Sequence, residues 1–125
     1  MSNGYKILLI EDEIYLNDLY KLVLEKEGYK VDTAYDGQKG IDLAQENPSV
    51  VLLDIMLPLV NGIDVLRNLK ENPATKDIPV IVLSNLGQDS VVQQAIKLGA
   101  LEYVIKLQIE PKQIVEKVNK VLGRA

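Results

Sequence analysis

Four short apolar runs of this chain end in polar side chains that are capable of chemistry. The run VVLL is followed directly by Asp54, and ILLI is followed by Glu11 and Asp12. The run PVIVL ends at Ser84, and YVI ends at Lys106. An ionised carboxylate beside a buried strand costs free energy unless a cation or hydrogen bonds satisfy it. Acids, a hydroxyl and an ammonium in these positions therefore indicate a functional site.

These residue types favour magnesium-assisted phosphoryl chemistry. Two carboxylates about 4 Å apart repel by roughly 4 kcal/mol at an effective dielectric near 20, and a bound cation removes that repulsion. Mg²⁺ prefers oxygen ligands, whereas zinc prefers histidine and cysteine, which this chain lacks. A lysine and a hydroxyl beside the metal would meet an anion, and a carboxylate would be the nucleophile. Asp54 is therefore a candidate acceptor of a phosphoryl group, as an aspartyl phosphate.

Each of these residues also has a purely structural explanation. Asp54 could cap a turn after its strand, and Ser84 could satisfy loop backbone groups. Lys106 could be a solvated surface charge. The acids at 11–13 could open a helix whose dipole they complement, and we expect Glu13 to do only that. Their shared position at strand ends favours a common site.

Alternating strands and helices must bring these residues together. Apolar runs predict strands at 6–10, 29–35, 50–54, 79–84 and 101–106. Apolar residues at helical spacing predict helices at 13–27, 36–47, 62–72, 88–99 and from about 111 until Gly123. Near-continuous apolar strands joined by helices are typical of a parallel sheet covered on both faces, a doubly wound α/β domain. The carboxyl ends of its strands share one edge, where ligands bind.

Length and composition set further bounds. We expect one domain over residues 1–125, with 1–4 as a flexible head and no output domain. The absence of cysteine rules out a disulfide framework, and the absence of histidine removes the commonest neutral-pH base. The net charge of −4 argues against direct nucleic-acid binding. The first apolar run is too short for a signal peptide or a membrane span, so we expect a cytoplasmic location without membrane insertion.

Over essentially its whole length, the chain resembles the receiver domain of two-component response regulators. The segments that carry the resemblance are ILLIEDE, LLDIMLPLVNG, PVIVLS and EYVIK, with Pro58 four and Gly62 eight residues beyond Asp54. The resemblance implies a flavodoxin-like (βα)5 fold with strand order 2-1-3-4-5. It also implies that Asp54 accepts a phosphoryl group from a sensor histidine kinase or a phosphotransfer protein, which switches the interaction surface of the receiver.

The resemblance also implies a magnesium site. Asp12 would bind Mg²⁺ directly and Glu11 mostly through water. Asp54 and the backbone carbonyl of Met56 would be the other protein ligands. The expected cofactor is therefore Mg²⁺, held by oxygen atoms alone.

The remaining implied roles concern phosphoryl binding and switching. Lys106 would pair with Asp54 and then with the phosphoryl oxygens. Ser84 would hydrogen-bond the phosphoryl group in the active state and draw its loop inward. Tyr103 would turn from exposed to buried as that loop moves, and an ordinary ring at a strand edge is the equally weighted alternative.

Three departures from the family pattern concern the loops after the last two strands. Leu107 follows the lysine where proline is usual, so we expect a trans peptide bond there, and Pro111 comes later than usual. Asn85 replaces a small residue after the hydroxyl, and its side chain could restrict access to the phosphoryl group. Ser84 stands where threonine is commoner, but it keeps the hydroxyl.

The expected output is a changed protein-binding surface. It would contact a downstream protein target or an output domain through the fourth helix, last strand and fifth helix, including Ile96, Lys97, Tyr103, Leu107 and Gln113. The protein would be a monomer or a weak phosphorylation-dependent dimer. A stand-alone regulator and a receiver cut from a longer chain are both compatible with the sequence.

Three other functions are alternatives. A phosphatase of the haloacid-dehalogenase class would need Asp-x-Asp after the first strand, but the sequence there is Glu-Asp-Glu. A flavin carrier would need hydroxyls and glycines in that loop. A degenerate receiver that only docks would not need the intact residue set. We therefore expect a phosphoacceptor switch that assists its own phosphorylation and dephosphorylation, and not an enzyme.

Overall fold

A computed structural model describes residues 3–124 and shows a five-stranded parallel sheet. The strands are β1 (Lys6–Ile10), β2 (Lys30–Ala34), β3 (Val50–Leu53), β4 (Val80–Ser84) and β5 (Glu102–Ile105). They lie in the order β2-β1-β3-β4-β5, and each neighbouring pair is parallel. The predicted doubly wound α/β fold with strand order 2-1-3-4-5 is confirmed.

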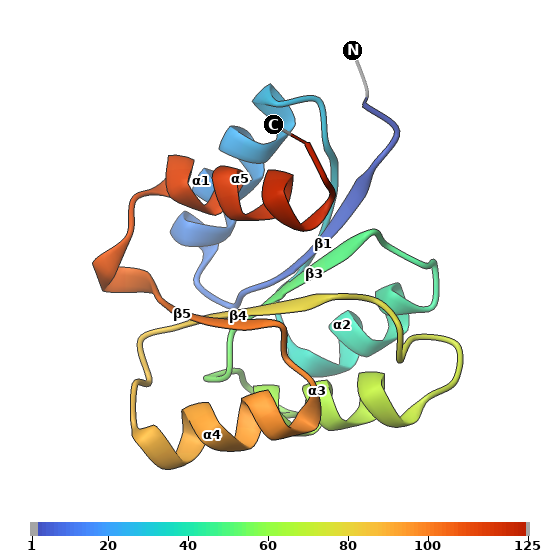
Figure 1. Ribbon diagram of the computed structural model, residues 1–125, viewed down its shortest axis with the longest axis vertical. Coiled ribbons are helices and arrows are strands. Elements are labelled where there is room, and N and C mark those ends of the chain that lie inside the picture. The colour runs from blue at the N-terminus through green and yellow to red at the C-terminus, as the bar shows by residue number, and fades with distance from the viewer. Residues whose placement is uncertain (1–2, 125) are drawn as a thin grey trace.

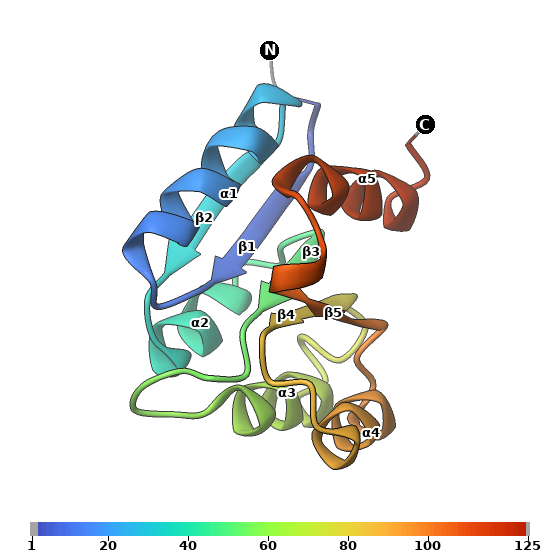
Figure 2. The same cartoon turned by 90° about the vertical axis from the view of Figure 1, so that its left-hand side faces the viewer.

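Helices cover both faces of this sheet. They are α1 (Ile14–Lys26), α2 (Gly37–Ala44), α3 (Gly62–Glu71), α4 (Asp89–Leu98) and α5 (Pro111–Val121). Helices α1 and α5 lie on one face, and α2, α3 and α4 lie on the other (Figure 1). The view turned by 90° shows the loops that leave the carboxyl ends of the strands (Figure 2). A short 3-10 turn, η1 (Lys106–Gln108), joins β5 to α5.

The central strands are apolar throughout because both of their faces are buried. Successive side chains point to opposite faces of a strand, so each strand contributes to two cores. One core lies under α1 and α5 and includes Ile7, Leu9, Val50, Leu52, Ile81 and Leu83. The other lies under α2, α3 and α4 and includes Leu8, Ile10, Val51, Leu53, Val80 and Val82. This rigid sheet holds the strand ends in fixed positions.

The structure differs from the sequence prediction at some element ends. Strand β2 ends at Ala34, and Tyr35 beyond it is 44% exposed. Helix α2 ends at Ala44, before the predicted position, and Asn47 adopts a left-handed conformation with φ of 58°. The first segment follows the edge strand β2, and the second leads into the central strand β3. Neither difference moves a residue of the predicted site.

The predicted flexible head covers residues 1–4, of which residues 1 and 2 lie outside the described part of the chain. The Asn3 amide N–H donates a 2.8 Å hydrogen bond to the Gly28 carbonyl. The flexibility of the head stays a prediction. Within residues 3–124, no helix has the length and the apolar character that crossing a membrane requires.

We expect Gly62→Ala to destabilise the protein strongly. Gly62 packs against the chain that follows β3, and a Cβ atom there would lie 2.3 Å from both the Asp54 carbonyl oxygen and the Ile55 Cα. Backbone atoms cannot give way as a flexible side chain can, so the free energy of unfolding should fall by about 3 kcal/mol. Urea unfolding should show a lower midpoint with an unchanged slope.

Gly87→Ala is the matched control for this substitution. The single atom within 4 Å of a Cβ at Gly87 is the Ile105 Cδ1, at 3.2 Å, and a side-chain end can shift. If both variants unfolded at the urea midpoint of the wild type, close backbone packing at Gly62 would be refuted.

Candidate functional site

The predicted site residues meet at the carboxyl edge of the sheet. Strands β1 and β3 are neighbours in register, with Ile10 opposite Leu53. The Asp54 N–H continues this pairing by donating to the Ile10 carbonyl at 3.0 Å. Asp54 therefore lies beside Glu11, which follows Ile10. The fold brings together acids that are distant in sequence because both strands end at the same level.

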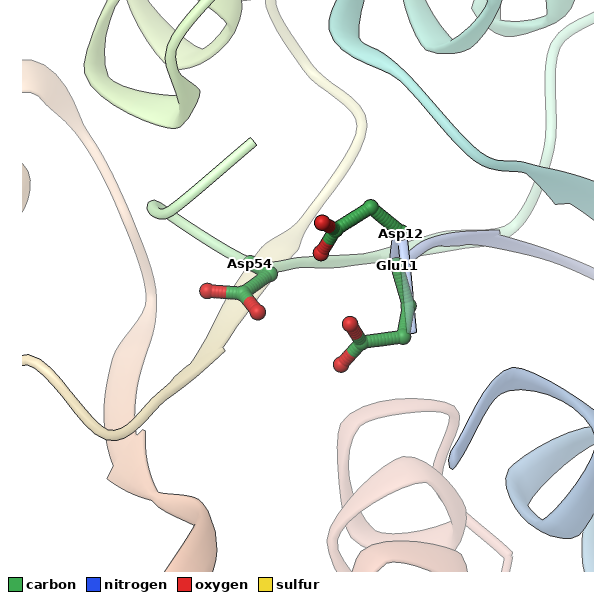
Figure 3. A group of neighbouring side chains, drawn as sticks. All are labelled: Glu11, Asp12 and Asp54. Carbon is green, nitrogen blue, oxygen red and sulfur yellow. The ribbon is translucent and has the colours of Figure 1, made fainter. Parts of the chain in front are cut away.

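Three carboxylates face one another at this edge. Each of Glu11, Asp12 and Asp54 offers an oxygen, and these oxygens lie within 4.8 Å of one another. Figure 3 shows the three carboxyl groups directed towards a common space. Glu11 is 2% exposed and Asp54 is 5% exposed, whereas Asp12 is exposed. The cluster thus consists of two buried carboxylates, Glu11 and Asp54, and one carboxylate that faces solvent, Asp12.

Lys106 bridges the two buried carboxylates. Its Nζ lies 2.6 Å from Glu11 Oε1 and 2.7 Å from Asp54 Oδ2, and its side chain is 8% exposed. The lysine follows β5, which pairs with β4, whereas the two acids follow the central strands β1 and β3. The sequence predicted the pairing with Asp54, and the structure adds the equally short contact with Glu11.

Burial and pairing together set the protonation of this bridge. Burial lowers the pKa of Lys106, but the hydrogen bonds to Asp54 and Glu11 and the attraction of their charges together outweigh it, so the pKa rises above its ordinary value. Burial also raises the pKa of Glu11, although the hydrogen bond from Lys106 opposes that effect. Lys106 is therefore charged at neutral pH.

The second oxygen of each buried carboxylate has a backbone partner. The Met56 N–H donates to Asp54 Oδ1 at 2.9 Å, and the Glu13 N–H donates to Glu11 Oε2 at 3.0 Å. These bonds fix both carboxyl planes before any ligand arrives. The Glu13 side chain itself makes no capping hydrogen bond at the start of α1.

The donor set fits a hard divalent cation. When ionised, three carboxylates and one ammonium leave a net charge of −2 in a partly buried cluster. Oxygen ligands alone, with one acid facing solvent, suit Mg²⁺, which keeps several waters and uses few protein ligands. Glu11, Asp12 and Asp54 would hold such an ion. The role of the Met56 carbonyl as a further ligand stays a prediction.

Ser84 is the last residue of β4, and Tyr103 lies within β5 opposite Val82, so both are separated by β3 from the acids that follow β1. Ser84 is fully buried, and its Oγ accepts a 3.2 Å hydrogen bond from the Leu86 N–H. The Tyr103 hydroxyl donates to the Leu86 carbonyl, and burial raises its pKa. One loop residue thus contacts both predicted switch side chains. The ring of Tyr103 is half-buried in this state.

The two unusual residues of the neighbouring loops contact each other. The described peptide bonds are all trans, including the Lys106–Leu107 bond, as predicted. The Leu107 N–H donates to Asn85 Oδ1 at 2.9 Å, so the Asn85 amide oxygen is engaged by the next loop. The Leu107 side chain is 86% exposed.

Asn17 supports the site, although the sequence analysis did not identify it. Its Nδ2 donates a 2.9 Å hydrogen bond to the Glu11 carbonyl, and the residue is fully buried on α1. A buried asparagine inside an amphipathic helix is unusual, because buried polar groups need partners. A polar residue on an apolar helix face was the signal in the sequence.

Comparisons with known proteins identify the family. Residues 7–119 match the family model of the response regulator receiver domain. The chain is 34% identical over 125 residues to the transcriptional regulatory protein ResD of Bacillus subtilis, covering 99% of this chain and 50% of ResD. It is 36% identical over 120 residues to CpxR of Escherichia coli, covering 96% of this chain and 50% of CpxR. The chain thus spans about half the length of these relatives.

A solved structure agrees with this result. The signal receiver domain of a DNA-binding response regulator from Colwellia psychrerythraea superposes with a TM-score of 0.87 at 27% identity, covering 97% of this chain and all of that one. The chain belongs to the response regulator receiver domain family of two-component systems. Family membership decides against the phosphatase and flavin-carrier alternatives.

Proposed function

We propose that Asp54 is the phosphoryl acceptor of this receiver domain and that Mg²⁺ assists the transfer. The observation that carries the proposal is the bridge from Lys106 to Asp54 and Glu11, beside Asp12. It joins a nucleophile, a positive charge for phosphoryl oxygens and a set of metal ligands in one place.

The residues divide the chemistry among them. An Asp54 carboxylate oxygen attacks phosphorus and forms an O–P bond. At the same time the bond between phosphorus and the donor breaks, and its electron pair leaves with the donor. The Met56 N–H keeps the other oxygen in place. Lys106 and the Ser84 hydroxyl then meet phosphoryl oxygens. When bound, Mg²⁺ supplies further positive charge to those oxygens.

Incubation with Mg²⁺ and acetyl phosphate tests this proposal. The intact mass should increase by one phosphoryl group, and the adduct should require Mg²⁺ and be labile to alkali. If no adduct forms, tight binding of Mg²⁺ with beryllofluoride would show that the site is intact but that this donor fails. A receiver domain of RstA from Klebsiella pneumoniae, 27% identical with a TM-score of 0.84, has been crystallised in a BeF3-activated form. Failure of both tests would leave the docking-only alternative.

We expect Asp12→Asn to weaken Mg²⁺ binding by about tenfold or more. Asp12 is the exposed acid of the cluster, so its carboxylate is free to meet a hydrated ion without breaking the buried bridge. Calorimetric titration with Mg²⁺ measures the change. Glu13→Gln is the matched control, because Glu13 is the adjacent exposed acid outside the cluster. An equal loss of affinity in both variants would show that only overall charge matters.

We propose that the phosphoryl donor is a histidine kinase or a phosphotransfer protein, as membership of the receiver family implies. The chain would act as a switch, without turnover of an independent substrate. ResD and CpxR are transcriptional regulatory proteins about twice as long as this chain. Their length supports the proposal that the signal passes to an output domain or to a separate protein target. A cytoplasmic location stays a prediction from the sequence.

We propose that the output surface is the α4–β5–α5 face. Ile96 is 46% exposed and Leu107 is 86% exposed, whereas Gln113 is engaged by the Glu110 N–H at 2.7 Å. Adding Mg²⁺ and beryllofluoride should therefore shift the amide NMR signals of Ile96 and Leu107 while leaving Lys30, on the β2 edge, unchanged. Shifts confined to the acidic loop would contradict this surface. Sedimentation in both states distinguishes a monomer from a weak dimer.

A further inference from the structure

We propose that Asn85 is a positioning residue for Lys106, acting as a latch between the loops after β4 and β5. Its side-chain oxygen accepts the Leu107 N–H at 2.9 Å. We call this hydrogen bond between the Leu107 N–H and Asn85 Oδ1 the latch. The proposal rests on the proposed function, because Lys106 matters here through its part in phosphoryl transfer.

The latch holds the middle of a turn that is anchored at its two ends, by the buried ion pairs of Lys106 and by the packing of Ile109 on the core. Leu107 is the second residue of η1, and the first N–H groups of a helical turn have no carbonyl partner within it. The Leu107 side chain is 86% exposed and Gln108 is exposed, so burial anchors neither residue. Within the turn, the Ile109 N–H reaches the Lys106 carbonyl at a long 3.4 Å. Between these two anchors, the solvent-exposed Asn85 contact holds the Leu107 N–H.

Fixing this backbone fixes the direction of Lys106. The latched N–H belongs to the peptide group directly after Lys106, so its orientation limits where the lysine side chain can reach. Lys106 Nζ must meet two carboxylate oxygens at 2.6 and 2.7 Å, which leaves little tolerance. A small rotation of the turn would lengthen both contacts. Geometry of this precision matters for the transfer step.

The latch also joins the two loops that carry the phosphoryl-binding groups. Ser84 is paired with Ile105 in the sheet, and Asn85 and Leu107 lie just beyond this last pair. Asn85 thus extends the link between β4 and β5 past the end of the ladder. The two departures from the family pattern depend on each other. A proline at 107 would have no N–H to donate, and a small residue at 85 would have no side-chain oxygen to accept that hydrogen bond.

Asn85→Ala tests the latch by two measurements. The Leu107 amide should exchange hydrogen about fivefold faster, because one neutral hydrogen bond is lost. With saturating Mg²⁺ and acetyl phosphate, the phosphorylation rate should also fall by about fivefold. Asn85→Asp keeps an acceptor oxygen and should keep slow Leu107 exchange. Gln88 lies in the same loop, and its side-chain amide makes no capping hydrogen bond to α4. Gln88→Ala should therefore change neither the Leu107 exchange rate nor the phosphorylation rate.

A double variant shows whether Asn85 acts through Lys106. In the Lys106→Met background, Asn85→Ala should leave the residual phosphorylation rate unchanged, since no ammonium remains to be positioned. A further fivefold loss there would overturn the positioning role. Unchanged Leu107 exchange in Asn85→Ala would overturn the latch itself. If the wild-type protein neither forms an adduct nor binds Mg²⁺ with beryllofluoride, the proposed function fails, while the exchange experiment still decides whether the latch exists.

Discussion

Asp54→Asn should abolish formation of the phosphoryl adduct with acetyl phosphate. The substitution replaces a carboxylate oxygen with an amide nitrogen that carries hydrogens and cannot act as the nucleophile. The carboxylate now accepts from Met56 N–H with one oxygen and from Lys106 Nζ with the other. An amide can keep only one of these bonds, so Lys106 would also lose part of its attraction to position 54. Intact mass measured over time gives the result directly.

The fold should survive this substitution. Removing one of three clustered acids relieves repulsion, so the free energy of unfolding should stay within about 1 kcal/mol of wild type. Asp77→Asn is the matched control, because Asp77 is exposed and precedes β4, at the opposite end of that strand from Ser84. It should be phosphorylated like the wild type. An adduct of undiminished yield on Asp54→Asn would place the acceptor elsewhere and refute the proposed chemistry.

Lys106→Met should slow phosphorylation by about a hundredfold or more. Methionine keeps the length and apolar stem of the side chain but removes the ammonium that would stabilise charge on the phosphoryl oxygens. The loss of a preorganised charged donor is expected to act on the transfer step. Single-turnover kinetics at saturating Mg²⁺ separate this effect from weaker metal binding.

The same substitution should destabilise the protein in Mg²⁺-free buffer. Glu11 and Asp54 would remain buried without their counter-ion. Removing one partner of a buried ion pair lowers the free energy of unfolding by about 3 kcal/mol. The pKa of Lys106 is raised by the pairing, so its contribution is complete below 10.5 and is lost as pH rises through the folded-state pKa. At neutral pH the full loss should appear in urea unfolding, and Mg²⁺ should restore part of it.

Lys117→Met is the matched control for this stability effect. Lys117 on α5 pairs with Glu102 on β5, but these side chains are 31% and 41% exposed. An exposed pair contributes less than about 1 kcal/mol. If Lys117→Met and Lys106→Met lowered the free energy of unfolding equally, the buried bridge would contribute no more to stability than an exposed ion pair.

The sequence predicted most of this fold because its signals are periodic. Apolar runs such as VVLL and helical spacing in the segments between them gave all five strands and all five helices. The 3-10 turn at 106–108 was not predicted, because KLQ has no periodic pattern and its Leu107 and Gln108 are exposed. The ends of β2 and α2 also differed from the prediction, since local hydrogen bonds at the end of an element decide where it stops.

The placement of the acids, Ser84 and Lys106 followed from one topological rule, that parallel strands end at a common edge. Contacts that depend on side-chain conformation did not follow from it. The second bond of Lys106, to Glu11, requires its ammonium to lie between two acids, and the Asn85 contact requires a specific loop path. Periodicity carries no information about either feature.

The bridge joins the first strand of the chain to the last, with Glu11 and Lys106 separated by 95 positions. During synthesis the two acids emerge long before their counter-ion, and a chain shorter than 106 residues holds them without it. Chains that end before Lys106 should therefore be unable to take up the phosphoryl group. The complete site can therefore form only after all five strands have been synthesised, because Lys106 directly follows β5.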